Sequence, residues 1–277
     1  MIRSMSRRRL FCELGPFAFW LSRQKGIWLR HLHDVFSAAR FCRKRQTESL
    51  PILVFQHESR IRRRLAGVDP VLQNNKATNL ALAAPRIDGV IIRPGETFSL
   101  WRLLGNTTRR KGYLPGLVIA CGKPQAGEGG GMCQLSNLLH WMILHSDLTI
   151  TEHHHHDRFD LFPDDGRQVP FGMGTSIVYN YLDYRVTNTT SRSYQFRLWV
   201  DGDFLRGELR ADDNLPCRYR IRMENERFVQ GKDGVYRSGE VYRDSLLHDG
   251  KILSSELLRR NRALVMYDTS GLKIEDE

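Results

Sequence analysis

The chain has 277 residues, 41% of them hydrophobic and 10% aromatic, so a packed core in one large domain or two small ones is expected. Residues 1–64 hold 15 Lys and Arg against 4 Asp and Glu, whereas the remaining residues carry 27 of each sign. The five cysteines are odd in number, widely spaced and contain no CxxC pair, which argues against a disulfide framework or a structural zinc site.

The first residues resemble a signal sequence without meeting its requirements. Three arginines precede the apolar segment Leu10–Leu21, but Glu13 and Pro16 interrupt it and no small-residue cleavage site follows. No run of about 18 apolar residues occurs in the chain, so no transmembrane helix is expected. We therefore expect the protein in the cytoplasm or peripherally at the inner face of the membrane, without a cleaved signal.

A basic amphipathic helix is predicted between Gly26 and Phe41. Trp28, Leu32 and Val35 fall on one helical face, with arginines and lysines beside it. Such a helix can lie on an anionic membrane, or it can dock on the body of the protein. The charge of this end would also suit nucleic acid, but no recognisable binding motif supports that partner. Residues 1–50 are predicted to form this basic extension, and residues 51–277 the main domain.

The rest of the chain predicts an α+β fold. A helix pattern covers Asn74–Ala84, and short strands are expected at Ile87–Ile92 and Leu117–Cys121. The last third shows β-branched and aromatic runs separated by turn residues, which is typical of an antiparallel sheet: Ser176–Tyr184, Tyr194–Val200, Phe204–Leu209, Arg218–Met223 and Ala263–Tyr267. The expected architecture is N-terminal helices and a Gly-rich loop leading into a Cys-bearing helix, packed on a mostly antiparallel sheet.

The segment most indicative of chemistry surrounds Cys133. Gly129, Gly130 and Gly131 precede it, and an apolar helical face (Leu135, Leu138, Leu139, Met142 and Ile143) follows. Cys133 is therefore expected in the first turn of a helix, where the dipole lowers the pKa of a thiol. The glycines would let a substrate approach the sulfur, since they carry no Cβ.

Groups that could support a thiol nucleophile lie close by in the sequence. Backbone N–H groups at Cys133 and Gln134, with the Gln134 side-chain amide, could bind an oxyanion, and Ser136 would support them. Downstream, Leu148–Thr151 is expected to form a strand that runs into Glu152 and four consecutive histidines. Glu152, His154 and His156 would share one face, opposite His153 and His155. His154 or His156 is the predicted base, and Asp157, Asp160, Asp164 or Asp165 could orient the imidazole.

Other interpretations of these residues stay open. A single cysteine is often a buried apolar residue rather than a nucleophile. The histidines with Cys133 could bind zinc, although consecutive strand residues cannot all face one ion and no second cysteine is near. We expect no metal and no cofactor. His140, two helical turns after Cys133, is expected to be structural or exposed.

Several motifs together make the chain resemble the VanW family over about residues 57–200. They include Asn79-Leu80, Gly129 through Ser136, Glu152 with the histidines, His57-Glu58-Ser59, Pro94 to Ser99, Lys111-Gly112-Tyr113, Val169 to Gly172 and Asp183-Tyr184-Arg185. The family's Glu-Arg-His-x-His segment maps its histidines onto His154 and His156, with His153 in place of the usual arginine.

The resemblance implies a part in glycopeptide resistance. In longer exported relatives the VanW domain looks like an L,D-transpeptidase module that uses its cysteine. A cysteine-dependent acyltransferase or amidase acting on peptidoglycan peptides is one expectation, with Cys133 attacking a carbonyl. A non-catalytic binding module for cell-wall precursors, or for a resistance partner, is the other. The expected partner is thus a peptidoglycan precursor or stem peptide, with an anionic membrane surface as a second partner of the basic end.

Overall fold

The computed structural model describes residues 11, 14–63, 69–120, 123–155, 158–161, 163–164 and 168–276. Its helices are α1 (Pro16–Phe36), α2 (Pro70–Ala83), α3 (Leu100–Leu104) and α4 (Met132–Leu144), with 3-10 turns at Ala84–Arg86 and Arg109–Lys111. The strands form several sheets in which most neighbouring strands are antiparallel. The predicted α+β class is confirmed.

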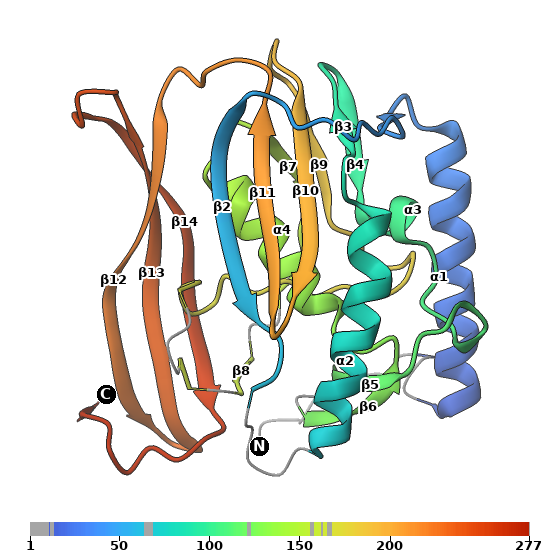
Figure 1. Ribbon diagram of the computed structural model, residues 1–277. Coiled ribbons are helices and arrows are strands. Elements are labelled where there is room, and N and C mark those ends of the chain that lie inside the picture. The colour runs from blue at the N-terminus through green and yellow to red at the C-terminus, as the bar shows by residue number, and fades with distance from the viewer. Residues whose placement is uncertain are drawn as a thin grey trace, which may run out of the picture.

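A central antiparallel sheet carries the cysteine-bearing helix. Its strands, in order, are β2 (Ile52–Arg60), β11 (Phe204–Ala211), β10 (Tyr194–Asp201) and β3 (Ile91–Ile92). Helix α4 packs on β2 and β11, and α2 contacts α4 (Figure 1). Along β11 every second residue is buried, because successive side chains point to opposite faces of a strand.

The apolar face predicted for the cysteine-bearing helix is confirmed. The predicted positions Leu135, Leu138, Leu139, Met142 and Ile143 are all buried in the main core. Phe98, Tyr184 and Phe196 belong to the same core, which also receives Leu205 and Leu209 from β11. Burial of these apolar side chains therefore fixes α4 in the core, and with it the position of the helix start.

A second sheet joins the N-terminal part to the middle of the chain. Its order is β1 (Arg40–Phe41), β4 (Glu96–Ser99), β9 (Arg185–Thr187) and β7 (Thr149–Glu152). β1 pairs with β4 in parallel, and β9 pairs antiparallel with β4 and β7. The predicted strand before the histidines is therefore present as β7, and the boundary at residue 50 stays a prediction.

Two further sheets complete the structure. A two-stranded hairpin pairs β5 (Pro115–Ala120) with β6 (Lys123–Glu128), which leads into the glycine run. A long sheet has the order β15 (Ile274–Asp276), β12 (Arg218–Gly231), β13 (Gly234–Leu246), β14 (Ile252–Val265) and β8 (Phe159–Asp160). In Figure 1, β12–β14 and α1 lie on opposite sides of the central sheet.

One predicted strand is wrong. Residues Ser176–Tyr184 form a loop that contains only an isolated bridge between Val178 and Leu182 among its described pairings. Asn180 has a positive φ of 46°, which breaks an extended conformation, and its side-chain amide donates to the carbonyl of Ile27 in α1 (3.3 Å). The loop therefore contacts α1 and lies beside α4.

Candidate functional site

A large cavity of about 3400 Å³ opens between α4, the end of β2 and the segments around 153–155 and 168–182. Of the predicted site residues it is lined by Gly129, Gly130, Gly131, Cys133, Gln134 and His154. Glu152 and Ser136 do not line it, and His156 lies outside the described residues. Six of the predicted residues thus line one cavity, and their role in a site stays a prediction.

Cys133 occupies the first turn of α4, as predicted. The residue that caps this turn, Gly131, has φ of 109°, a conformation that L side chains rarely adopt, so the glycine fixes where the helix begins. Burial raises the pKa of the Cys133 thiol above its ordinary value, and a backbone hydrogen bond from Ile177 offsets only part of that effect. The lowered pKa expected from the helix position is therefore not observed, because desolvation outweighs the favourable backbone contacts.

Other atoms of the protein occupy the space beside the glycine run. A Cβ on Gly130 would lie 2.2 Å from the carbonyl carbon of Gly116, and one on Gly129 would lie 2.2 Å from Oγ1 of Thr107. A Cβ on Gly131 would meet the side chain of Lys76 at 2.5 Å. These glycines permit close packing of neighbouring segments, which differs from the expectation that they open a path for a substrate.

Asn79 of α2 ties the glycine run to the β5–β6 hairpin. Its Nδ2 donates to the carbonyl of Gly130 and to that of Leu114, each at 2.9 Å, while its Oδ1 accepts from the N–H of Leu114 at 2.8 Å. The side chain is fully buried. Asn79 therefore uses its whole amide to hold two backbone segments in place, a role that the sequence alone did not reveal.

Two polar residues of α2 face the same cavity and were also missed. Lys76 is buried, and burial, helped by the positive charge of Arg63, lowers its pKa to about 8. Gln73, one helical turn earlier, is buried with neither of its side-chain amide atoms hydrogen-bonded. Both line the cavity beside the glycine run. A ligand with polar or anionic groups could therefore form the hydrogen bonds and charge contacts that these two side chains offer.

The two residues predicted to support the cysteine have structural partners. The Nε2 of Gln134 donates to Oγ of Ser59 (2.8 Å) and to the carbonyls of Ser59 and Arg60, so this amide joins α4 to the end of β2. Oγ of Ser136 donates to the carbonyl of Cys133 (3.0 Å) and pairs with the hydroxyl of Thr175. These groups position the helix start, and the Gln134 amide is already engaged rather than pointing toward an oxyanion.

The alternation predicted for the histidine segment is observed where the structure describes it. Nε2 of His154 lies 2.9 Å from Oε1 of Glu152, so these two side chains share a face. On the other face, the rings of His153 and His155 lie 3.8 Å apart between centroids. Backbone contacts also link this segment to α4. The carbonyl of His154 accepts a hydrogen bond from the N–H of Ser176, and the next residue, Ile177, contacts Cys133.

A buried histidine cluster continues from this second face into α4. The ring of His140 lies 4.0 Å from that of His153, and its Nδ1 lies 3.1 Å from the hydroxyl of Tyr184. Burial lowers the pKa of His153 to about 3 and that of His140 well below its ordinary value, so both rings are neutral at pH 7. His140 is buried and belongs to this cluster, which settles the two alternatives left by the sequence.

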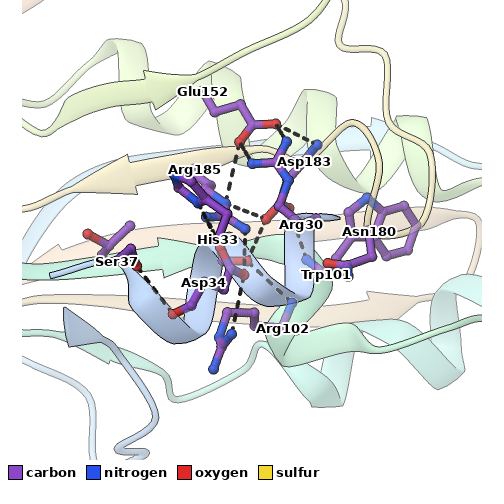
Figure 2. A network of polar contacts seen from close by, with 12 residues as sticks. Arg30, His33, Asp34, Ser37, Trp101, Arg102, Glu152, Asn180, Asp183 and Arg185 are labelled. Carbon is purple, nitrogen blue, oxygen red and sulfur yellow. Dashed lines mark hydrogen bonds and ion pairs between the residues drawn. The ribbon is translucent and has the colours of Figure 1, made fainter. Parts of the chain in front are cut away.

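Glu152 also joins an ion-pair network centred on α1 (Figure 2). Its carboxylate binds Arg30 through two hydrogen bonds of 2.6 Å, and Arg185 contacts it at 3.4 Å. Arg185 in turn pairs with Asp34 (2.7 Å) and with Asp183 (2.8 Å). Burial tends to raise the pKa of Asp34 and of Glu152, but opposing contacts hold both pKa values below the ordinary ones. For Asp34 these contacts come from arginines, and for Glu152 they come from Arg30, His154 and the backbone of Asp183.

The acidic residues beyond the histidines lie near a different cation. Asp160 and Asp164 accept hydrogen bonds from Nη1 of Arg237 at 3.1 and 3.2 Å. Asp157 and Asp165 lie outside the described residues. Over the described part of the chain, no group of three or more His, Cys, Asp and Glu side chains is arranged to hold a metal ion.

The chain is similar in sequence to known proteins. The vancomycin B-type resistance protein VanW of Enterococcus faecalis is 34% identical over 221 residues, which cover 79% of this chain and 80% of that protein. This chain belongs to the VanW family. The family model described as VanW like protein matches residues 75–210, a range that contains Asn79, Cys133 and the Glu152–His154 pair.

A second relative matches a smaller part of the VanW-family chain. The uncharacterized protein YoaR of Bacillus subtilis is 29% identical over 146 residues, which are 53% of this chain and 46% of that protein. No solved structure matches the chain significantly. The glycine run, α4 and most of α2 fall within the family match, whereas α1 precedes it and β12–β15 follow it.

Proposed function

We propose that this VanW-family protein is a resistance-related cell-wall protein that acts on peptidoglycan peptides as a cysteine-dependent acyltransferase or amidase. One observation carries the proposal: Cys133 lines the same cavity as His154, whose imidazole is held by the carboxylate of Glu152. A thiol, an imidazole and an acid that orients the imidazole are the parts of a thiol acyl-transfer site. The name of the Enterococcus faecalis relative supports the link to vancomycin resistance.

The proposed reaction proceeds through a thioester. Because burial raises the pKa of Cys133, the thiol is protonated in the resting protein, and His154 would remove its proton as the sulfur attacks a peptide carbonyl. The Nε2 of His154 faces Glu152, so Nδ1 would receive that proton. A C–S bond then forms, the C–N bond breaks, and the proton passes to the leaving amine. An acceptor amine, or water in the amidase case, releases the acyl group and restores the thiol.

Lys76 and Gln73 would recognise the polar end of such a peptide. Both line the cavity, Gln73 has two unpaired amide atoms, and Lys76 carries a charge suited to a carboxylate. A stem peptide offers both peptide groups and carboxylates. Replacing Lys76 by Met should therefore weaken peptide binding about tenfold or more, measured by calorimetry, while Lys111→Met at an exposed site should not.

The test of catalysis is an intact-mass measurement. The full chain is incubated with a synthetic peptidoglycan stem peptide, quenched in acid and weighed. We expect an adduct with the mass of the acyl part, absent in Cys133→Ala and retained in Cys217→Ala, a buried cysteine that does not line the cavity. His154→Gln should slow adduct formation by about 10²–10⁴-fold. A persistent adduct in Cys133→Ala would refute the proposed nucleophile.

A non-catalytic binding module for cell-wall precursors is the second candidate. Two observations favour it: burial raises the pKa of Cys133, and the Gln134 amide is occupied by Ser59 and Arg60. This candidate predicts that Cys133→Ser binds stem peptide as the wild type does and complements a deletion strain in a vancomycin susceptibility assay. Catalysis predicts that the same variant binds peptide but fails to complement.

A further inference from the structure

The outer side of α1 is apolar and exposed to solvent. Phe17, Leu21, Trp28, Leu32, Val35 and Phe36 point away from the protein, with exposed fractions between 43% and 84%. Positions 17, 21, 28, 32 and 35 fall on one side of a helix with 3.6 residues per turn. We call these six residues the α1 stripe.

The inner side of α1 is fixed to the protein by polar contacts. Arg30 binds Glu152, and Asp34 binds Arg185 and Arg102 at 2.7 and 3.2 Å (Figure 2). A Cβ on Gly26 would lie 2.3 Å from the ring of Tyr181, so the helix approaches the loop closely at this point. The helix therefore differs from the usual arrangement, because Arg30 and Asp34 are turned inward, and it cannot rotate to bury the stripe without breaking their ion pairs.

Exposed basic residues lie on α1 and directly after it in the chain. Lys25 lies on the same side of α1, and Arg40, Arg43 and Lys44 follow the helix; all four side chains are exposed. Over the described residues 14–63, ten Lys and Arg stand against three Asp and Glu. A partner that suits both features presents apolar material beneath an anionic surface.

We propose that α1 lies on an anionic lipid bilayer, with the stripe inserted at the boundary between headgroups and acyl chains and the basic residues against the headgroups. The stripe contains Trp and Phe, which favour this boundary. A second copy of the chain fits less well, because pairing two stripes would also bring two basic fringes together. This inference does not rest on the proposed catalytic function.

The arrangement also sets where the cavity lies relative to the bilayer. Phe19, Trp20 and Ile27 of α1 line the cavity, while Arg30 of the same helix holds Glu152, the carboxylate that pairs with His154. Docking through the stripe therefore brings the cavity with Cys133 beside the lipid surface. Among the helices that the structure describes, none is long and apolar enough to cross a membrane.

The test is sedimentation of the full chain with vesicles of phosphatidylcholine, alone or mixed with an equal part of phosphatidylglycerol. We expect binding to the anionic vesicles that weakens as salt is raised, and little binding to the neutral ones. Leu32→Gln with Val35→Gln should weaken binding about tenfold or more. The matched control is Ile252→Gln with Leu253→Gln, exposed apolar residues of β14 that should leave binding unchanged.

Three outcomes would overturn the proposal. One is no binding of the wild type to anionic vesicles, and another is equal binding by the stripe variant. The third is a wild type that is dimeric by sedimentation equilibrium while the stripe variant is monomeric, which would make the stripe a contact between copies. Since the substituted side chains are exposed, circular dichroism should show both double variants folded, so each outcome decides the question.

Discussion

The two sides of the cavity are built from opposite kinds of interaction. Beside Cys133, uncharged groups are packed closely: Gly130 against Gly116, and Asn79 on backbone carbonyls. Beside Glu152, ion pairs with charged side chains hold α1, and Asp34 and Arg185 within that network are almost fully buried. The first side has little tolerance for added volume, whereas the second is sensitive to the loss of a single charge. Each side can therefore be broken by a substitution that the other would tolerate.

The largest effect is expected from Arg185→Met. This change leaves Asp34 and Asp183 buried with fewer cationic partners, so unfolding should become easier by about 3–5 kcal/mol. The matched control is Arg260→Met, which removes an exposed pair with Glu240 and should leave the unfolding midpoint nearly unchanged, because solvent screens exposed pairs. Urea unfolding monitored by tryptophan fluorescence measures both. Equal midpoints would show that the network does not stabilise the fold.

On the uncharged side, Gly130→Ala should cost about 3 kcal/mol. The new methyl group would lie within 2.5 Å of the backbone of Gly116, which cannot move without disturbing the β5–β6 hairpin. Gly174→Ala is the control, because Gly174 lines the same cavity and a Cβ there meets no atom within 4 Å. If the two alanine variants unfold at the same urea concentration, the close approach at Gly130 is unimportant.

Acidification should lower the stability of the fold through His153 and through the ion-pair network in different pH ranges. The folded-state pKa of His153 is about 3, so below about pH 6.5 the unfolded chain binds a proton that the folded one does not. Stability should therefore fall as pH falls, by roughly 2 kcal/mol at pH 5 for this histidine. His153→Gln should flatten the curve between pH 7 and 5, measured by urea unfolding at each pH. An unchanged slope would contradict the assigned neutral ring.

The charged side should resist acid until lower pH. Asp34 and Glu152 have pKa values held below the ordinary 3.8 and 4.5, so their contribution is complete above those values and is lost as pH falls further. A second decline, reduced in Asp34→Asn, is thus expected below about pH 4. Its absence would mean that the arginines do not hold these carboxylates ionised.

The smallest effect concerns Cys133 itself and leaves stability untouched. Because burial raises the pKa of this thiol, the midpoint of its alkylation by iodoacetamide should lie above the value of about 8.5 for a free cysteine. Mass spectrometry of the peptide containing Cys133 follows the reaction, and the same peptide in urea gives the unperturbed midpoint. A midpoint below that of the unfolded chain would show a standing thiolate and remove the need for proton transfer to His154.

Much of the fold was visible in the sequence, because periodicity reports which face of an element is buried. The apolar face of α4 and the alternation of Glu152 with His154 both followed from spacing alone. The loop at 176–184 was mistaken for a strand, since its β-branched and aromatic residues gave no sign of the positive φ at Asn180. Strand β2 was missed, and its burial does not alternate regularly along the strand.

The sequence singled out residues that line one cavity, but it did not predict the contacts among them. The glycine run and Cys133 marked one wall, yet whether a substrate or Gly116 fills the space beside Gly130 depends on tertiary packing. Lys76 and Asn79 sit on the buried face of α2 with Leu80 and Ala83, and polar residues on an otherwise apolar face were the available signal. The pKa of Cys133 could not be foreseen, since burial in the fold outweighs helix position.

The pairing of β2 with β11 has a consequence for how the chain folds. Ile52 is opposite Ala211, so the central sheet cannot close until nearly the whole VanW-family segment has been synthesised. The β12–β13–β14 sheet, in contrast, forms between consecutive strands and needs only local loop closure. We therefore expect the native central sheet to form slowly. Until Arg185 has been synthesised, α1 lacks this ion-pair partner and exposes its apolar side to any surface nearby.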